Sequence, residues 1–415
     1  MIEILFSLAL LPLLLPAFSL FALTLAALTV RRTPARPAEP KGRAPRIAVI
    51  VPAHDESAHV LPTLECLKAQ LGPRDRLLVV ADNCSDDTAA LARAAGAEVV
   101  ERSDACLRGK GYALAFGVDH LRADPPEVVL VVDADCLVSE GGVAAIALDC
   151  HESGKPVQML DLMSARAGAG LKLRVLEFAM LMKNLVRPLG SFRLGGACHL
   201  MGTGMALPWA LIADARLATG HVAEDMKLGV ELTRAGHAPR FLVDARVSSA
   251  FVEHTGTVRT QKTRWEHGHL ATLREELPGL LRAAIVRRDP TLVVLAMDLM
   301  IPPVALYFLA LGTVLALSLV GALFWPALQP MAALAALAAL LFGLAIGLGW
   351  WVFGRHLLGA RELLALPLYA LWKLPVYLAY FAGRRSGWVR TRRNAGRRRL
   401  CRRPSGLQPR RDSGG

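Results

Sequence analysis

The chain has 415 residues, more than one ordinary domain needs, and 53% of them are hydrophobic. The formal charge of +13 would suit a nucleic-acid-binding protein, but residues 384–415 carry 12 Arg and one Asp, a net of +11, which leaves only +2 for the rest. A basic segment directly after an apolar one is typical of a cytoplasmic flank that faces anionic lipid. We therefore expect a protein that contacts membrane lipids and binds no nucleic acid, with a disordered Arg-rich tail over residues 384–415.

An apolar segment opens the chain. Residues 4–30 form a run of 27 without a charge, longer than the roughly 20 residues that cross a bilayer. A cleaved signal peptide would begin with basic residues, whereas here Arg31 and Arg32 follow the run. We predict a retained transmembrane anchor over residues 1–31, and the positive-inside rule then places the residues that follow in the cytoplasm. Residues 32–45, rich in proline, are expected to be a stiff linker.

Strand and helix patterns alternate over residues 46–255. Short apolar runs predict strands at 47–51, 77–81, 97–100 and 128–132, and longer patterns predict helices at 61–70, 88–95 and 110–121. This alternation is typical of an α/β domain with a mostly parallel sheet and right-handed crossovers. Because ligands of such sheets bind beyond the carboxyl ends of the strands, we expect a nucleotide-like ligand there.

Two carboxylates, Asp133 and Asp135, directly follow the last of these strands. They would repel each other unless a cation neutralised them, and Mg²⁺ is usually held by one or two carboxylates together with substrate phosphates. A metal–diphosphate site is therefore one interpretation. The other is a solvated acidic turn, which is the more common origin of an isolated D-x-D.

Polar loops also follow the first two strands. These are the segments Pro52-Ala53-His54-Asp55-Glu56 and Asp82-Asn83-Cys84-Ser85-Asp86-Asp87-Thr88, and Arg108-Gly109-Lys110-Gly111 adds cations further along. Each segment alone is as typical of a turn or a helix cap as of a site. Their repetition at equivalent places favours a shared ligand.

Residues 171–189 have the periodicity of an amphipathic helix, with Lys172, Lys183 and Arg187 opposite its apolar sector. A helix in the membrane interface and a helix packed into the soluble domain both fit this pattern.

Three further segments carry side chains suited to chemistry. Gly202-Thr203-Gly204 permits close approach of the backbone to a ligand, and Glu224-Asp225 begins an amphipathic helix that runs to Gly236. The two acids either stabilise the start of the helix through its dipole or include a general base. Gln261-Lys262-Thr263-Arg264-Trp265 combines an amide, a fixed cation and an indole; Arg suits a diphosphate and Trp offers a flat face to a sugar ring. Alone, that segment would be a surface helix.

The C-terminal apolar region predicts two membrane spans, within residues 291–323 and 331–353. Residues 363–381 are also apolar but carry Lys373, and a third span here would place the basic tail outside. We predict an interfacial or re-entrant segment instead. The seven cysteines lack metal-ligand spacing and fit reduced cytosolic thiols.

Taken in order, these motifs resemble the family 2 glycosyltransferases, in particular the membrane-bound branch that includes cellulose, chitin, hyaluronan and poly-N-acetylglucosamine synthases. The resemblance covers roughly residues 46–270. It rests on V-P-A-H-D-E at 51–56, A-D-N-C-S-D-D-T at 81–88, K-G at 110, D-A-D at 133, G-T-G at 202, E-D at 224 and Q-K-T-R-W at 261.

The resemblance implies a GT-A catalytic domain over residues 46–255, a Q-x-x-R-W segment with interface helices over 256–290, and a membrane region over 291–383. It also implies a UDP-sugar donor, Mg²⁺ or Mn²⁺, and inversion at the anomeric carbon. The metal ligands would be Asp135 and Asp133, and the catalytic residues Asp225, Glu224 and Arg264. Donor contacts would come from Pro52, Ala53, Glu56, Asp82, Lys110, Asp133 and Gln261, and acceptor contacts from Gly202, Thr203, Gly204 and Trp265.

We therefore expect a hexosyltransferase that adds sugar to a polysaccharide or lipid-linked acceptor at the cytoplasmic face of a bacterial inner membrane, with polysaccharide-assembly proteins as further partners. Ala223, where processive synthases commonly have Thr, and the short membrane region favour the alternative of a single transfer to a glycolipid or lipid carrier. A non-catalytic membrane scaffold and a phosphohydrolase are weaker alternatives. The intact acids and Arg264 argue against the first, and the Gln261–Trp265 segment against the second.

Overall fold

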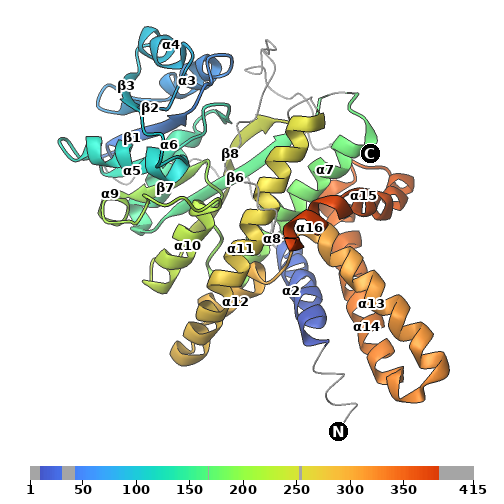
Figure 1. The fold of residues 1–415 in the computed structure, drawn as a ribbon. Coiled ribbons are helices and arrows are strands. Elements are labelled where there is room, and N and C mark those ends of the chain that lie inside the picture. Colours follow the sequence, from blue (N-terminus) through green and yellow to red (C-terminus); the bar gives the residue numbers. More distant parts are fainter. Residues whose placement is uncertain (1–9, 30–42, 167, 252–254, 383–415) are drawn as a thin grey trace, which may run out of the picture.

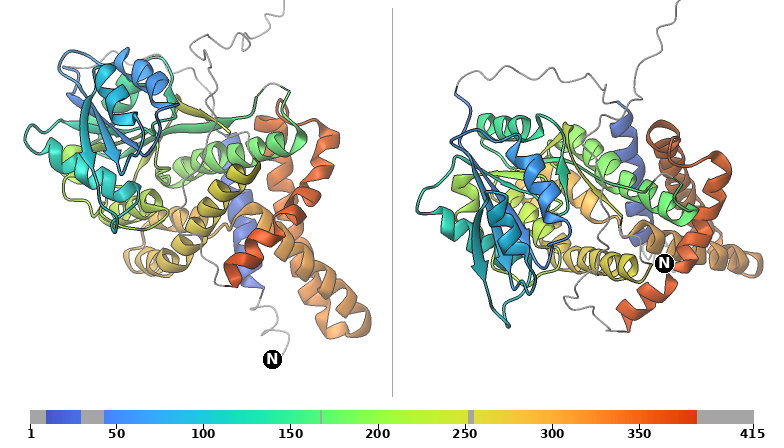
Figure 2. Two further views of the ribbon diagram at one scale, coloured as in Figure 1. Left: turned by 45° about the horizontal axis from the view of Figure 1, so that its top comes forward. Right: turned by 90° about the horizontal axis from the view of Figure 1, so that it is seen from above.

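The computed structural model describes residues 10–29, 43–166, 168–251 and 255–382. Most of the predicted linker and all of the predicted Arg-rich tail lie outside the described residues. An α/β domain occupies one side of the molecule, and a hairpin of two long helices, α13 and α14, projects away from it (Figure 1). In both views of Figure 2, the yellow helix α11 lies between the sheet and the C-terminal helices.

Eight strands form a single mixed sheet in the order β3-β2-β1-β4-β7-β6-β8-β5. They are β1 (Ile47–Ala53), β2 (Arg76–Asp82), β3 (Glu98–Arg102), β4 (Val128–Val131), β5 (Leu137–Val138), β6 (Val157–Ser164), β7 (Met205–Pro208) and β8 (Arg240–Ala250). The pairs β1–β2, β2–β3, β1–β4 and β6–β8 are parallel, while β4–β7, β6–β7 and β5–β8 are antiparallel. The predicted α/β class with a mixed, mostly parallel sheet is confirmed.

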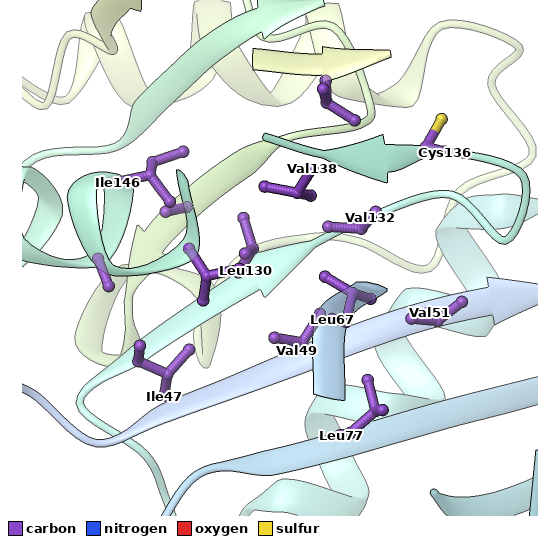
Figure 3. Close-up of a cluster of buried hydrophobic side chains, with 14 of the residues drawn as sticks. Ile47, Val49, Val51, Leu67, Leu77, Leu130, Val132, Cys136, Val138 and Ile146 are labelled. Atoms are coloured by element: carbon purple, nitrogen blue, oxygen red, sulfur yellow. The ribbon is translucent and has the colours of Figure 1, made fainter. Parts of the chain in front are cut away.

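Helices cover both faces of the sheet because its central strands are apolar on both sides. On one face lie α3 (Val60–Lys68), α4 (Thr88–Ala94) and α6 (Gly142–Ser153), and on the other α5 (Lys110–Leu121), α9 (Trp209–Ile212) and α10 (Glu224–Arg234). Figure 3 shows the first face, where Val49, Leu130 and Ile146 point into one buried cluster. The neighbouring residues along the same strands, such as Ile50, pack against α5 instead.

The predicted amphipathic helix at 171–189 is a longer helical run with a π-helical turn in its middle. It consists of α7 (Leu171–Leu181), η1 (Met182–Val186) and α8 (Arg187–Gly195). Its apolar side chains pack between the sheet and the membrane helices, against Leu160, Phe241 and Phe353. The helix is buried between these two parts of the molecule, so the choice between the two interpretations stays open.

The C-terminal half consists of helices. They are α11 (Thr255–Arg287), α12 (Pro290–Leu299), α13 (Val304–Phe324), η2 (Pro326–Leu328), α14 (Gln329–Gly349), η3 (Trp350–Gly354), η4 (Ala360–Ala365), α15 (Leu366–Trp372) and α16 (Leu374–Phe381). The predicted span within 291–323 is divided at Pro302 and Pro303, so α12 is a separate short helix and α13 alone is long enough to cross a bilayer.

Four segments among the described residues are long and apolar enough to span a membrane: 11–28, 304–324, 326–354 and 360–379. The first is α2 (Leu11–Leu28), whose Leu20 and Leu23 pack against α12, α13 and α14. It crosses α8 at Gly190, where an added Cβ would lie 2.0 Å from the Leu23 carbonyl oxygen, so only glycine fits. The last segment is divided at Lys373, and its interfacial or re-entrant placement stays a prediction.

Candidate active site

A polar cavity of about 330 Å³, hereafter the polar cavity, lies where β4 ends, beside the loop before β7, the start of α10 and the middle of α11. Nine residues predicted from the sequence line it: Lys110, Asp133, Asp135, Gly202, Thr203, Glu224, Asp225, Arg264 and Trp265. They come from segments up to about 150 residues apart in the chain, so the fold brings together most of the predicted site.

The two acids after β4 form the floor of the polar cavity. Asp133 pairs with the Lys110 ammonium, which also donates to the Gly202 carbonyl oxygen at 2.8 Å. One ligand atom each from Asp133, Asp135 and Cys136 lie within 4.8 Å of one another. Burial, with the charge of Asp133 added, raises the pKa of the Cys136 thiol well above its usual range, so this residue stays a protonated thiol. Two carboxylates remain as ligands for a hard divalent cation.

The loop Gly202-Thr203 crosses the same floor in a conformation that glycine alone permits easily. Gly202 has φ of +84°, and a Cβ there would lie 2.9 Å from Asp225 Oδ2 and 3.3 Å from Lys110 Nζ. A residue that the motifs do not include holds this loop. The buried Gln158 accepts from the Met201 N–H and donates to the Thr203 carbonyl, both at 2.8 Å. The close approach of the backbone to two charged groups explains the predicted glycine.

Glu224 and Asp225 begin α10 and face the polar cavity. Burial, and then the charge of Asp225, raises the pKa of Glu224 to about 8. Burial also raises the pKa of Asp225, although Lys110 and the Met226 N–H, which donates to Asp225 at 2.8 Å, act in the opposite direction. Raised carboxyl pKa values in a cleft are typical of general acid–base sites.

A third acid, Asp161 on β6, lines the same cavity. Burial, with Asp133 as the next cause, raises its pKa to about 7, and Asn184 Nδ2 donates to it at 3.1 Å. Lys110 behaves differently, because the nearby carboxylates outweigh its burial and raise its pKa overall. The polar cavity thus gathers three acids with raised pKa values, Asp161, Glu224 and Asp225, and suits a ligand that brings a cation.

Four charged or polar residues whose place in the site the sequence interpretation missed line the polar cavity from α8, α11, α12 and the segment before β7. They are Arg187, His199, His269 and Asp298. Arg187 Nε donates to Asp298 Oδ1 and its Nη2 to the Asp298 carbonyl, both at 2.6 Å, with both side chains buried. Asp298 was available as a signal, because a carboxylate inside an apolar segment is usually paired or functional. Nothing in the motifs identifies His199 or His269.

Helix α11 contributes Arg264 and Trp265, and Trp265 packs against Met163, Leu176 and Met180. The next residue, Glu266, pairs with Lys373 of the C-terminal apolar segment. Lys373, which interrupts the apolar segment, therefore neutralises a carboxylate next to Trp265, the residue predicted to contact the acceptor. Gln261 lies on α11, but its side chain lies outside the described residues.

Five predicted residues do not line the polar cavity. Pro52, Ala53 and Glu56 lie at and after the end of β1, and Asp82 ends β2, where Arg102 Nη1 donates to it at 2.7 Å. Gly204 sits under β6 and β8 instead, since a Cβ there would lie 2.4 Å from Met159 Cγ. The roles proposed for these five residues stay predictions.

Residues 45–268 match the model of a family described as "Glycosyltransferase like family 2". The chain belongs to this family. The match covers more than half of the chain and every residue that lines the polar cavity except His269 and Asp298. It confirms the family resemblance and, with the observed mixed sheet, the α/β GT-A fold, whereas the synthase branch stays a prediction.

Individual relatives of this family 2 chain are distant. The "Probable glycosyltransferase YdaM" of Bacillus subtilis (strain 168) is 24% identical over 235 residues, which is 54% of this chain and 55% of that protein. The chain therefore aligns with about half the length of this curated relative.

Two solved structures align with parts of this chain. Mannosyltransferase PcManGT from Pyrobaculum calidifontis, in complex with GDP-Man and Mn²⁺, has a TM-score of 0.49 and 17% identity over 85% of this chain and 99% of that one. TarS 1–349 of S. aureus, in complex with UDP-GlcNAc, has a TM-score of 0.36 and 16% identity over 50% and 59%.

Proposed function

We propose that this protein is a membrane-bound, inverting glycosyltransferase that transfers a hexosyl group from a UDP-sugar to an acceptor hydroxyl at the cytoplasmic face of the bacterial inner membrane. One observation supports this above all. A family 2 domain presents the carboxylates Asp133 and Asp135 on the floor of the polar cavity and Asp225, with its raised pKa, on the wall. Such a cavity can hold a metal-bound donor and a base at once.

The residues after β4 suit Mg²⁺ or Mn²⁺. Asp135 would be the principal ligand, with Asp133 next to it, because Lys110 already neutralises part of the Asp133 charge. The bound cation would offset the charge of the diphosphate. Both carboxylates belong to one short loop, so replacing one of them should weaken metal binding without removing the fold.

The remaining residues supply the groups that an inverting transfer needs. Asp225 takes the proton from the acceptor hydroxyl, whose oxygen forms a bond to the anomeric carbon. The bond from that carbon to the diphosphate oxygen breaks on the opposite face, and the electron pair leaves with UDP. Arg264 and Gln261 are proposed to hold this leaving group, since guanidinium and amide donors suit phosphate oxygens. Trp265 offers its ring to the acceptor sugar.

The uridine part of the donor is proposed to lie at the ends of β1 and β2, over Pro52, Ala53, Glu56 and Asp82. β1 pairs with β4, and β2 pairs with the other edge of β1, all in parallel, so their carboxyl ends open on the same edge as the metal ligands. The acceptor is a polysaccharide or a lipid-linked glycan, and both classes need the same base and leaving-group contacts.

The direct test is release of nucleoside diphosphate from a panel of UDP-sugars and GDP-sugars by the full-length protein in phospholipid nanodiscs, with membrane lipid extract as acceptor. We expect release from at least one UDP-sugar, loss of release with EDTA, and recovery with Mn²⁺ or Mg²⁺. Release from GDP-sugars alone would refute the UDP donor, and release that EDTA leaves unchanged would refute the metal.

A variant locates the metal within the site. Asp135→Asn should raise the Mn²⁺ concentration that gives half-maximal release by at least about tenfold, because it removes a charged ligand. Asp149→Asn is the matched control, since Asp149 pairs with Arg240 outside the polar cavity. Equal Mn²⁺ requirements in the two variants would exclude Asp135 as the ligand.

A further inference from the structure

A second, apolar cavity adjoins the polar cavity, and the inference drawn from it rests on the proposed function. This apolar cavity has a volume of about 510 Å³ and lies between α7, α13, α14 and α15. Five residues line both cavities: Met180, Lys183, Arg187, Trp265 and His269. The two cavities therefore share a wall, and Trp265 stands at the junction.

The apolar cavity runs along the membrane helices. Its α13 wall extends from Val304 to Leu315, about 16 Å at the rise of an α-helix and half of the roughly 30 Å hydrocarbon core. The side chains along this wall and the facing α14 wall include Phe308, Phe342 and Ile346. A glycan chain would leave its hydroxyls without partners against such walls, whereas an alkyl chain would bury its surface favourably.

Small residues keep the apolar cavity open. A Cβ added at Gly312, Gly343 or Gly347 would meet no atom within 4 Å, although all three glycines lie on helices that pack against each other. The space in front of them is therefore cavity, of the size that typical ligand sites have. Larger side chains at these positions would fill it without touching the helix backbone.

The shared wall is polar and has unused groups that suit an anion. Lys183 lies in both cavities; burial lowers the pKa of its amine, while the charges of Asp225 and Asp161 act in the opposite direction. His269 is 6% exposed, and its Nε2 has no hydrogen-bond partner among the described residues. Arg187, by contrast, is already bound to Asp298. The Lys183 amine and the His269 ring nitrogen thus line the inner end of the apolar cavity, where a phosphate would favour the charged form of Lys183 and could bond to both groups.

We propose that the acceptor is a lipid-linked saccharide, with its alkyl chain in the apolar cavity, its phosphate at Lys183 and His269, and its sugar beside Trp265 with one hydroxyl directed to Asp225. Lys183, His269 and Trp265 belong to the wall that the two cavities share, and Asp225 lines the polar cavity alone, so the alkyl chain and the reacting hydroxyl of such a lipid would lie on opposite sides of this wall. The step is the one given above. The acceptor oxygen bonds to the anomeric carbon, its proton passes to Asp225, and UDP leaves with the electron pair.

The test uses the full-length protein in nanodiscs, with the UDP-sugar found by the release assay and three synthetic acceptors. They are glucose or N-acetylglucosamine linked through phosphate to a dodecyl group, the same sugar linked through phosphate to a methyl group, and a dodecyl glycoside without phosphate. We expect the KM of the dodecyl phosphate acceptor to be at least about tenfold lower than that of the methyl acceptor, because its chain is buried.

Two variants test where the alkyl chain and the phosphate of the acceptor bind. Gly347→Leu should raise the KM of the dodecyl phosphate acceptor about tenfold, whereas Ala336→Leu, on an exposed part of the same helix outside the apolar cavity, should not. Lys183→Met should remove the preference for the phosphate-linked acceptor over the dodecyl glycoside. The wild-type comparison of chain lengths stands even if a variant does not fold.

Transfer with equal KM for the dodecyl and methyl acceptors would overturn this inference while leaving the proposed function intact. Growth of a polymer ladder on a free oligosaccharide, or transfer to phosphatidylglycerol in preference to the synthetic acceptor, would overturn it as well. Absence of UDP release with every donor and acceptor would instead overturn the proposed function, and this inference with it.

Discussion

The acidic side chains at the two ends of the polar cavity have pKa values that are shifted in opposite directions. At the sheet end, Glu224, Asp225 and Asp161 have raised pKa values, since burial favours their neutral forms. At the membrane end, Arg187 outweighs the burial of Asp298 and lowers its pKa overall, so that this carboxylate stays ionised. The sheet end therefore suits a ligand that brings a cation, whereas at the other end the Arg187–Asp298 pair is satisfied within the protein and joins α8 to α12.

Among the variants that test this contrast, Asp225→Asn is expected to have the largest effect. Loss of the proposed base should lower the rate of transfer by about 10²–10⁴-fold, while the melting temperature should not fall, because a buried carboxyl with a raised pKa adds no stability in its charged form. Rates and thermal unfolding of the same preparations check both parts. Asp119→Asn, at an exposed position of α5, is the control, and a wild-type rate in Asp225→Asn would remove Asp225 from the mechanism.

The membrane end should respond in the opposite way. Arg187→Met leaves Asp298 charged and buried without its partner, which should cost about 3–5 kcal/mol of stability. The double variant with Asp298→Leu should recover a large part of that loss. Denaturation in matched detergent measures both, and Arg122→Ala, which breaks an exposed pair, should shift the transition far less. Equal effects of the single and double variants would contradict the coupling.

The rate of transfer, which depends on Asp225, and the stability, which depends on Asp298, should respond differently to pH. A general base must be deprotonated, so transfer should fall as pH decreases through the raised pKa of Asp225, at a midpoint above the ordinary value of about 3.9 and about tenfold per pH unit below it. The lowered pKa of Asp298 means that its stabilising pair is lost only below that ordinary value. Initial rates and melting temperatures should therefore diverge across the acid range. Unfolding that follows the loss of rate at each pH would contradict this.

The smallest expected effect concerns Asp82, which lies outside the polar cavity and contacts Arg102 and Asn83. If it contacts the nucleoside as proposed, Asp82→Asn should raise the KM for the UDP-sugar by up to about tenfold and change kcat little, as expected for uniform binding. Initial rates over a range of donor concentrations measure this. An unchanged KM with a lower melting temperature would make the Asp82–Arg102 pair structural only.

The sequence was sufficient where structure is decided locally. The strands at 47–53 and 76–82 and the helix at 110–121 follow from apolar runs and their boundaries, and the site residues at strand ends follow from the sheet topology. The polar side of residues 171–189 was also assigned to Lys183 and Arg187. That side meets a cavity and a buried carboxylate rather than water, and periodicity does not distinguish these environments.

Long-range pairing accounts for the rest. Arg187 and Asp298 are 111 residues apart, and their pair could not be inferred because each partner alone reads as a surface cation or an interruption of a span. The division between α12 and α13 was visible only as two prolines. Gln158, which fixes the glycine loop, lies in an ordinary strand pattern and carries no motif at all.

The pairing of Glu266 with Lys373 bears on how this enzyme could be recombined with its relatives. The family match ends at residue 268, yet the charge that neutralises Glu266 comes from the break between α15 and α16, more than a hundred residues later. A chimera cut at the edges of the family region would set a buried carboxylate beside a foreign segment. Exchange of acceptor specificity should therefore succeed only when α11 and the segment around Lys373 are inherited together.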